Sequence, residues 1–304
     1  MEFLQLQYFC ELAKRQHLTQ TASAMMVSPS AISNSISRLE NELGVKLFDR
    51  IGRNLRLNSY GEAYFKHVTR AISELEDGQR ELSDMQGSRE TRLVLATTNP
   101  FVWQEPIQAF HRLHPYIQLR HIHFDPISSK SPLPHEPADI IIACPDAFSH
   151  PEWDSAPLFE DKIVLAVPPG HRFSGRSSME LAEAKDEWFV SLSKSSFSVK
   201  CDELCREAGF EPKSRIECDY MMRPKMILNE NMVCLTTYNG RNTGIFKGVP
   251  IIPLTDVSAK RDQSIFWKKS RYLPSAVKLL RDYMLDLYRD YIPDNDNLFL
   301  DVKK

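Results

Sequence analysis

Short polar side chains recur between residues 28 and 38, with the sizes and spacing that suit contact with nucleic acid. Ser30, Ser33, Asn34 and Ser37 fall on one face of a helix, and Arg38 lies beside them. Hydroxyl, amide and guanidinium groups of this size reach phosphates and base edges without steric bulk. The pattern predicts a helix that reads DNA. The alternative is a three-helix scaffold that binds protein or only caps the chain.

Three arginines follow in a segment that contains no acidic residue from position 50 to position 58. Arg50, Arg53 and Arg56 lie there, and Gly52 and Asn54 favour a tight turn between two short strands. Such a hairpin would bring a local positive charge to the DNA backbone or minor groove. Residues 1–66 hold eight Lys/Arg and six Asp/Glu. This net +2 leaves −4 for the remainder of a chain whose total is −2.

The polar face and the hairpin need a helical scaffold to position them. Apolar spacing predicts helices over 2–15, over Thr19–Met25 with Thr19 as N-cap, and over 29–44. Ser28 and Pro29 are typical of a helix start, and Gly44 is typical of a helix end. The third helix also carries an apolar stripe on the side opposite its polar residues: Ile32, Ile36, Leu39 and Leu43.

A long amphipathic helix is predicted next, over residues 59–88. Ser59 and Glu62 have the spacing of a capping box. Apolar and small residues then repeat in steps of four and three, which predicts a seam for another helix and hence a homodimer. Packing on the chain's own core is the alternative. The seam consists of Tyr64, Val68, Ala71, Leu75, Gly78, Leu82 and Met85.

From residue 91 the sequence alternates between short apolar runs and amphipathic segments, which indicates α/β structure with parallel sheets covered by helices. A helix is expected to begin at Thr98-Asn99-Pro100, and another to run from residue 196 to 208. The expected strands are 93–97, 117–124, 139–143, 162–167, 187–192, 214–218, 233–236 and 263–268, before a closing helix over 273–288.

The segment from Phe3 to Gly61 resembles the DNA-binding domain of the LysR family of transcriptional regulators. The resemblance rests on Leu18-Thr19-Gln20-Thr21-Ala22, on the run Val27–Arg50, and on its Leu39-Glu40 and Leu47-Phe48 pairs. It implies a winged helix-turn-helix over 1–58, a recognition helix in the major groove and a wing at 50–56. The residues that it assigns to DNA contact are Thr19, Ser28, Ser30, Ser33, Asn34, Arg38, Arg50, Arg53 and Arg56.

Two residues depart from the family pattern. Thr21 replaces a small Ala, and Asn34 replaces the Arg or Gln that members often place at the groove-facing position. Because Asn pairs bidentately with adenine, the preferred operator is expected to differ.

Residues 91–304 are similar, less sharply, to the LysR effector domain. Matching segments include Ala138–Ile142, Leu158–Leu165 and Glu207–Pro212, whereas Asn229–Met232 replaces a Gly-rich turn. The resemblance implies two subdomains like those of periplasmic solute-binding proteins, one over about 91–162 and 265–292 and the other over about 163–264.

An effector site is expected between these subdomains, because ligands in open α/β sheets bind beyond the strand C-termini. Hydroxyls and backbone N–H groups at two helix starts would suit a carboxylate or another small anion. The alternative is that these hydroxyls are only helix caps. The candidates are Thr97, Thr98, Asn99, Phe101, Phe124, Ser191, Ser193, Ser195, Ser196 and Phe197.

No cofactor is expected beyond this effector. The six cysteines have no zinc-site spacing. Cys201 and Cys205 lie one helical turn apart, a poor geometry for a disulfide, so reduced thiols are favoured over redox sensing. Metal binding by the histidines near His121 and His123 is the less favoured interpretation.

Among function classes, a DNA-binding regulator is favoured over an enzyme and over a solute-binding protein. No nucleophile elbow, phosphate loop or paired-carboxylate motif occurs, and the start of the chain does not resemble an export signal. A cytoplasmic location is therefore expected, with no membrane contact. The implied partners are double-stranded DNA, the effector, further copies of the chain in a homodimer or homotetramer, and RNA polymerase. The residues after Tyr291 are expected to form a tail.

Overall fold

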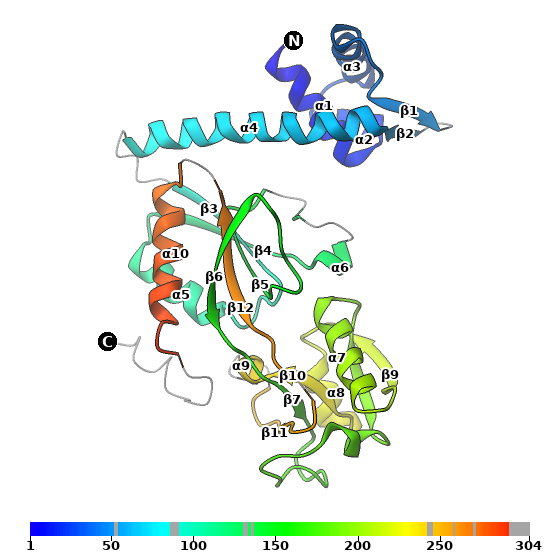
Figure 1. Cartoon of the computed structure of the whole chain (residues 1–304), viewed down its shortest axis with the longest axis vertical. Coiled ribbons are helices and arrows are strands. Elements are labelled where there is room, and N and C mark those ends of the chain that lie inside the picture. Colours follow the sequence, from blue (N-terminus) through cyan, green and yellow to red (C-terminus); the bar gives the residue numbers. More distant parts are fainter. Residues whose placement is uncertain are drawn as a thin grey trace. The chain divides into compact units, whose positions relative to one another are not determined.

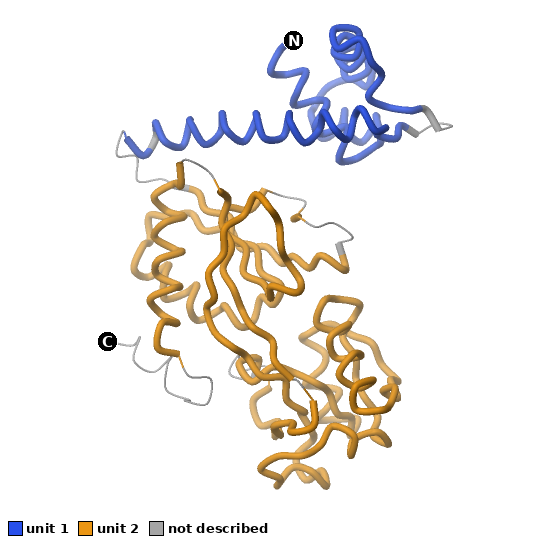
Figure 2. Tube along the Cα trace, viewed as in Figure 1, with its two compact units in different colours: residues 1–87 blue, residues 88–304 orange. Residues whose placement is uncertain are grey.

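The computed structural model describes residues 1–51, 54–85, 91–129, 133–134, 137–241, 246–257, 259–269 and 272–291. The chain divides into two compact units, residues 1–87 and residues 88–304 (Figure 2). In the first unit, three helices and a hairpin precede one long helix (Figure 1). Its elements are α1 Phe3–Arg15, α2 Leu18–Ala24, α3 Pro29–Leu43, β1 Phe48–Ile51, β2 Asn54–Leu57 and α4 Ser59–Met85.

The core of the first unit forms where the apolar faces of the short helices meet. Phe9 and Leu12 of α1 and Ile32 and Leu39 of α3 are fully buried, together with Leu47 before the hairpin. The predicted stripe of α3 therefore faces inward. Its helix begins after Ser28, has Pro29 as its first residue, and ends at Gly44, as predicted. Gly44 adopts φ 70°, a conformation that glycine tolerates best.

Two predicted helix caps are wrong by one or two residues. The Nδ1 atom of His17, not Thr19, accepts the Gln20 N–H at the start of α2. At the start of α4, Ser59 is already helical. The Oδ1 atom of Asn58 accepts the Gly61 N–H at 2.9 Å, so Ser59 and Glu62 do not form the predicted capping box.

The first half of α4 packs on its own unit, whereas its second half leaves apolar side chains exposed there. Val68 is buried, and Phe65 packs on the same core. Further along, Leu75, Leu82 and Met85 are 57%, 61% and 78% exposed in the single chain. Packing on the chain's own core therefore holds for the first half of the helix, and pairing with a second copy stays a prediction for the second half.

The second unit contains two lobes. The first lobe is built on a five-stranded sheet of order β4-β3-β5-β12-β6. β3 runs parallel to β4 and β5, but β12 runs antiparallel to β5 and β6, so the expectation of purely parallel sheets is wrong. Its elements are β3 Thr91–Thr97, α5 Gln104–Leu113, β4 Ile117–His123, α6 Pro126–Ser129, β5 Ile140–Ala143, β6 Trp153–Phe159, β12 Gln263–Lys268 and α10 Ser275–Leu287.

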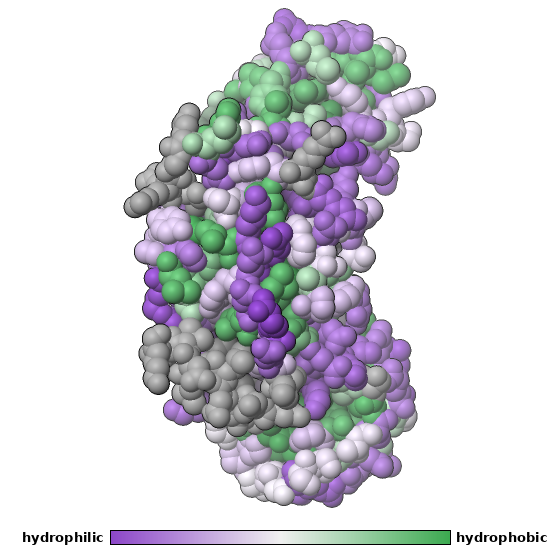
Figure 3. Space-filling model, turned by 60° about the vertical axis from the view of Figure 1, so that its left-hand side comes forward, coloured by the Kyte–Doolittle hydropathy of each residue, from purple (hydrophilic) through white to green (hydrophobic). Residues whose placement is uncertain are grey.

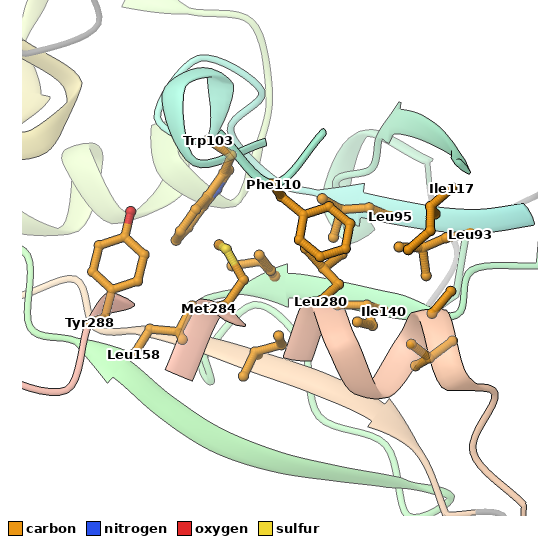
Figure 4. Packing of buried hydrophobic residues seen from close by; sticks show 14 of the residues in the cluster. Leu93, Leu95, Trp103, Phe110, Ile117, Ile140, Leu158, Leu280, Met284 and Tyr288 are labelled. Carbon is orange, nitrogen blue, oxygen red and sulfur yellow. The ribbon is translucent and has the colours of Figure 1, made fainter. Parts of the chain in front are cut away.

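Both faces of this sheet are buried, because successive side chains of a strand point to opposite sides. On one face, Leu93 and Leu95 of β3 pack with Phe110 of α5 and with Leu280 and Met284 of α10 (Figure 4). The alternate β3 residues, Val94 and Ala96, belong to a separate apolar cluster on the other face. The helix predicted from Thr98 begins only at Gln104.

The second lobe carries two small sheets, an antiparallel one of order β10-β7-β11 and a parallel pair, β8-β9. Leu204 and Val233 lie at the centre of one of its two apolar clusters, and Ile227 and Cys234 at the centre of the other. Its elements are β7 Ile163–Ala166, the short 3-10 helix η1 Leu181–Ala184, β8 Trp188–Leu192, α7 Ser196–Glu207, β9 Lys213–Cys218, α8 Arg223–Glu230, β10 Cys234–Thr237, α9 Tyr238–Arg241 and β11 Ile251–Pro253.

Two chain segments connect the lobes and run antiparallel to each other. Lys162 forms a bridge with Lys260, and the Arg261 N–H donates to the Asp161 carbonyl at 2.8 Å. This crossover puts Asp161 and Arg261 at the junction of the lobes.

Within the described residues, no helix is long and apolar enough to cross a bilayer. On the face drawn in Figure 3, hydrophilic residues are interspersed with smaller groups of hydrophobic ones.

Candidate DNA-binding surface and effector cavity

The outward side of α3 carries the polar residues predicted to contact DNA. Ser30, Asn34 and Arg38 are exposed, and Ser33 is half-buried. Neither Asn34 nor Arg38 makes a hydrogen bond or ion pair with any other described residue, so both side chains are free to bind a partner. Ser28 has a different role, because its hydroxyl accepts the Ala31 N–H at 3.2 Å and caps the helix.

A buried carboxylate joins α3 to the hairpin. Glu40 is only 7% exposed. One of its oxygens accepts the Leu47 N–H at 2.9 Å, and the other lies 2.8 Å from the Lys46 Nζ atom. These bonds fix the chain just before β1 relative to α3. In the sequence, Glu40 stood out only as part of a motif, although its place beside Leu39 on the inward side of α3 indicated this role.

The base of the hairpin is fixed to the start of α4. The Asn58 N–H donates to the Leu47 carbonyl at 3.0 Å. A Cβ atom at Gly61 would lie 2.2 Å from that same carbonyl oxygen, so only glycine fits there without moving the backbone. The hairpin is therefore held from both sides, by α3 and by α4.

The hairpin arginines are described only in part. Arg56 is exposed and makes no hydrogen bond or ion pair with other described residues; it lies across from Asp49 in the strand register. Arg50 lies in β1, opposite Leu55. Arg53, predicted at the tip of the wing, lies outside the described residues. Thr19 is exposed on α2.

An open cavity lies where the lobes of the second unit meet. Four of the ten predicted effector residues line it: Thr98, Asn99, Phe101 and Phe197. The remaining lining residues come from both lobes and from the crossover: Val102, Asp161, Tyr220, Thr236, Thr237, Gly240, Phe246, Arg261 and Gln263.

The other predicted effector residues lie outside this lining. Thr97 is buried, and its hydroxyl lies 2.8 Å from the Nε2 atom of His121. Phe124 belongs to the apolar core beneath the sheet. The Ser191 hydroxyl donates to Ser214, and Ser193 is exposed. Thr97 ends β3, and Phe124 and Ser193 each follow a strand, as predicted, but none of the four residues lines this cavity.

The predicted anion site at the start of α7 is occupied by a carboxylate of the chain itself. Ser195 caps the helix by accepting the Ser198 N–H at 3.1 Å. The Ser196 N–H and hydroxyl both donate to Asp125, at 2.9 and 2.7 Å to one of its oxygens. Asp125 is 3% exposed and also accepts the N–H groups of Ile127 and Ser128 at the start of α6. It therefore links the two lobes.

Arg261 is the cation that lines the cavity, and no sequence pattern predicted it. Its guanidinium carbon lies 4.9 Å from the centroid of the Phe197 ring, and one Nη atom donates to the Ser196 hydroxyl at 3.2 Å. The side chain is only 7% exposed and has no carboxylate within ion-pair distance among the described residues. Its remaining N–H donors are therefore available to an anion in the cavity.

Two other ionisable groups line the cavity. Burial raises the pKa of Asp161 to about 6, although the Asn239 and Lys162 N–H groups and the Thr237 hydroxyl oppose the rise by donating to its carboxylate. Burial also raises the pKa of Tyr220 to about 12, against the opposing charges of Arg261 and Arg223. Tyr220 is thus a neutral hydroxyl at pH 7, and Arg261 is the positive charge of this site.

No group of three His, Cys, Asp or Glu side chains that could hold a metal ion occurs in the part of the chain that the structure describes. His121 instead bonds to Thr97. Cys201 and Cys205 are free thiols on α7, and burial raises the pKa of each to about 12.

Comparison with known proteins places both units in one class. Residues 3–62 match the family described as bacterial regulatory helix-turn-helix protein, lysR family, and residues 86–289 match the LysR substrate binding domain. The uncharacterized HTH-type transcriptional regulator YybE of Bacillus subtilis (strain 168) is 26% identical over 307 residues, which covers 95% of this chain and 100% of YybE. The transcriptional dual regulator GltC of the same organism is 24% identical over 296 residues, covering 95% and 98% of the two chains.

Solved structures show the same fold. A full-length OxyR variant from Pseudomonas aeruginosa is 22% identical, with a TM-score of 0.67 over 94% of this chain and 98% of that one. Full-length CbnR complexed with its target DNA is 19% identical, with a TM-score of 0.52 over 93% and 98%. The fold and the two matched domains define a helix-turn-helix transcriptional regulator with an effector-binding domain.

This chain belongs to the LysR family of transcriptional regulators, because the family models match well over half of it. The winged helix-turn-helix and the two-lobed α/β effector domain predicted from the sequence are confirmed.

Proposed function

We propose that this regulator reads its operator through the outward face of α3, with Asn34 and Arg38 at base edges and Ser30 and Ser33 at phosphates or bases. The observation that carries this proposal is the contrast between the two sides of α3. One side is buried, and the other bears exposed polar groups, of which Asn34 and Arg38 have no hydrogen-bond or ion-pair partner among the described residues. Arg50, Arg53 and Arg56 of the hairpin bind the adjacent backbone, together with Thr19 of α2.

The effector is a small anion that binds in the cavity between the lobes. Arg261 supports this proposal, since a buried guanidinium with free donors is a site for a carboxylate. Phe101, Phe197 and Phe246 offer apolar contact to the rest of such a molecule, and Thr98 and Asn99 offer polar contacts.

Asp125 can couple the binding of the effector to the relative position of the two lobes. The carboxylate of Asp125 already occupies the Ser196 donors, and Arg261 donates to the same hydroxyl. An effector acid group at Arg261 would compete with Asp125 for Ser196 and thus alter the link between the lobes. Differential binding to two lobe arrangements is what lets a ligand shift their populations.

The assembly is a homotetramer built from α4-mediated dimers, which grips two DNA sites and contacts RNA polymerase. The exposed Leu75, Leu82 and Met85 support pairing through α4, because burying them against a second copy removes apolar area from water. The protein acts by binding alone, without catalysing a reaction, and works in the cytoplasm, where its DNA target lies.

The effector proposal is tested by the thermal unfolding of the full-length protein with a panel of small dicarboxylates, succinate among them. At least one should raise Tm in the wild type and in Lys247→Met, a control in which an exposed lysine is removed. The same compound should leave Tm unchanged in Arg261→Met. If the compound still raises Tm in Arg261→Met, the effector binds outside this cavity.

A further inference from the structure

A second buried arginine, Arg223, lies inside the second lobe. It is the first residue of α8 and only 3% exposed. One Nη atom donates to the Leu235 carbonyl, and the Nε–H has no hydrogen-bond partner. Among the described residues, no carboxylate lies within ion-pair distance of it. A buried cation without a counterion is strongly unfavourable, so a partner for this charge is expected.

The groups nearest to Arg223 do not supply that counterion. The charge of Arg223 acts on the Tyr220 hydroxyl and on three cysteine thiols, Cys201, Cys218 and Cys234, of which Cys234 also forms a hydrogen bond with it. Burial raises the pKa of each of these thiols, to about 12 for Cys201. All three are therefore neutral at pH 7, and the guanidinium charge remains uncompensated by the protein.

Arg223 lines an open cavity between α7 and β8, distinct from the cavity that contains Arg261. Ser198 adds a hydroxyl, and Phe189, Leu192 and Leu235 add apolar surface. Asp202, an exposed residue of α7, also lines this cavity. The lining thus combines one positive charge, an apolar wall and a negative charge on its exposed side.

We propose that this second cavity is an anion-binding site for a small monocarboxylate, separate from the effector cavity between the lobes. The carboxylate binds the guanidinium of Arg223, including its free Nε–H, and a short apolar chain contacts Phe189, Leu192 and Leu235. A single negative charge matches the single guanidinium, and Asp202 repels a ligand that carries a second one. This inference does not depend on the effector proposal, since the two cavities have no lining residue in common.

Propionate is the probe, because it combines a carboxylate with a short apolar chain. Its binding to the full-length protein is measured by equilibrium dialysis for the wild type, Arg223→Met, Arg261→Met and the surface control Lys247→Met. Arg223→Met should weaken one class of site by about ten- to a hundredfold, the range that losing a charge-assisted hydrogen bond predicts. Arg261→Met should leave that class intact. If Arg223→Met binds propionate as the wild type does, or if no site survives in Arg261→Met, the proposal is wrong.

A second measurement needs no variant, in case Arg223→Met fails to fold. Crystals of the wild-type protein grown in sodium bromide should show an anomalous bromide peak at hydrogen-bond distance from the Arg223 Nε atom. Bromide peaks elsewhere on the protein, with none at Arg223, would overturn the proposal.

Discussion

Glu40 and Asp161 are buried carboxylates whose hydrogen bonds fix backbone near the two functional regions. Glu40 accepts the Leu47 N–H beside the hairpin, and Asp161 accepts the Lys162 and Asn239 N–H groups at the lobe junction. A carboxylate that accepts backbone N–H groups orients the chain around it, and removing its charge leaves those donors with weaker partners.

Glu40→Gln should destabilise the first unit. The amide keeps the shape of the side chain but loses the charge that strengthens the bonds to Leu47 and Lys46, at a cost of about 1 to 3 kcal/mol. Denaturant unfolding of the full-length protein measures this. Glu74→Gln, on the exposed side of α4, is the matched control and should change stability little. Equal effects of the two substitutions would contradict the role of Glu40.

Asp161→Asn tests the raised pKa of the junction carboxyl. Because its pKa rises from 3.8 to about 6 on folding, the native state binds this proton more tightly than the unfolded chain does. The wild type therefore loses the stability contributed by this group as pH rises through about 6, whereas the amide does not titrate. The difference in unfolding free energy, variant minus wild type, should grow by about 1 to 2 kcal/mol between about pH 5 and about pH 8. A difference that does not depend on pH would contradict the burial argument.

At the scale of elements, α3 and the hairpin are the proposed DNA-binding surface, and α4 is the proposed pairing surface. Arg56→Ala should lower the salt dependence of DNA binding by about one unit of log–log slope, because one phosphate contact is lost. The slope is measured by fluorescence anisotropy on random duplex DNA over a range of salt. Arg112→Ala, an exposed arginine of α5 in the second unit, is the control. An unchanged slope for Arg56→Ala would exclude the hairpin from backbone contact.

Leu75→Glu should weaken dimerisation. A leucine that is 57% exposed in the single chain is expected to be buried against the α4 of a second copy. Replacing it with a charge should raise the dimer dissociation constant at least about ten- to a hundredfold. Analytical ultracentrifugation measures the shift, with Glu74→Gln as the neighbouring control. A dimer of undiminished strength would place the interface elsewhere.

Elements whose ends are set by residues close in the sequence could be predicted. Elements that depend on contacts between distant segments could not. The bounds of α3 follow from Ser28, Pro29 and Gly44, which act within a few residues. Strand β6 was missed because exposed Asp154 and Ser155 interrupt its apolar pattern and because it pairs only with β12, about a hundred residues later. The expectation of parallel sheets was wrong for the same reason. The direction of β12 depends on where the chain returns from the second lobe to the first.

In the candidate sites, likewise, residues on one helix were predicted together, and residues that distant segments bring together were not. The polar face of α3 is local and was predicted residue by residue. In the effector cavity, Arg261 meets Ser196 and Phe197 only because the chain folds back over more than sixty residues, so no spacing in the sequence indicated it. Asp125 was missed likewise. The start of α7 was predicted to bind an effector anion, but the anion that occupies it is the carboxylate of Asp125 from the other lobe.

For the whole molecule, the contact between Asp125 and Ser196 joins the two lobes of the effector domain. Asp125→Ala removes the acceptor of the Ser196 N–H, so hydrogen exchange in the first turn of α7 should accelerate at least about tenfold, the factor that losing about 1.4 kcal/mol of protection implies. Mass spectrometry of peptides covering residues 195–200 measures this. Asp146→Ala, an exposed aspartate of the same lobe as Asp125, should leave the exchange unchanged. Unaltered exchange in Asp125→Ala would show that this contact does not hold the lobes.

The central claim, that the protein reads a specific DNA sequence through α3, is tested most directly by selection from random duplex DNA with the purified full-length protein. A dimer with two-fold symmetry places its two recognition helices in successive turns of the major groove, so the selected DNA should contain an inverted repeat. The variant with both Asn34→Ala and Arg38→Ala should lose that enrichment while keeping salt-dependent nonspecific binding. If the wild type enriches no sequence even at low salt, or if the double variant enriches the same repeat, the assignment of α3 as the reading element is wrong.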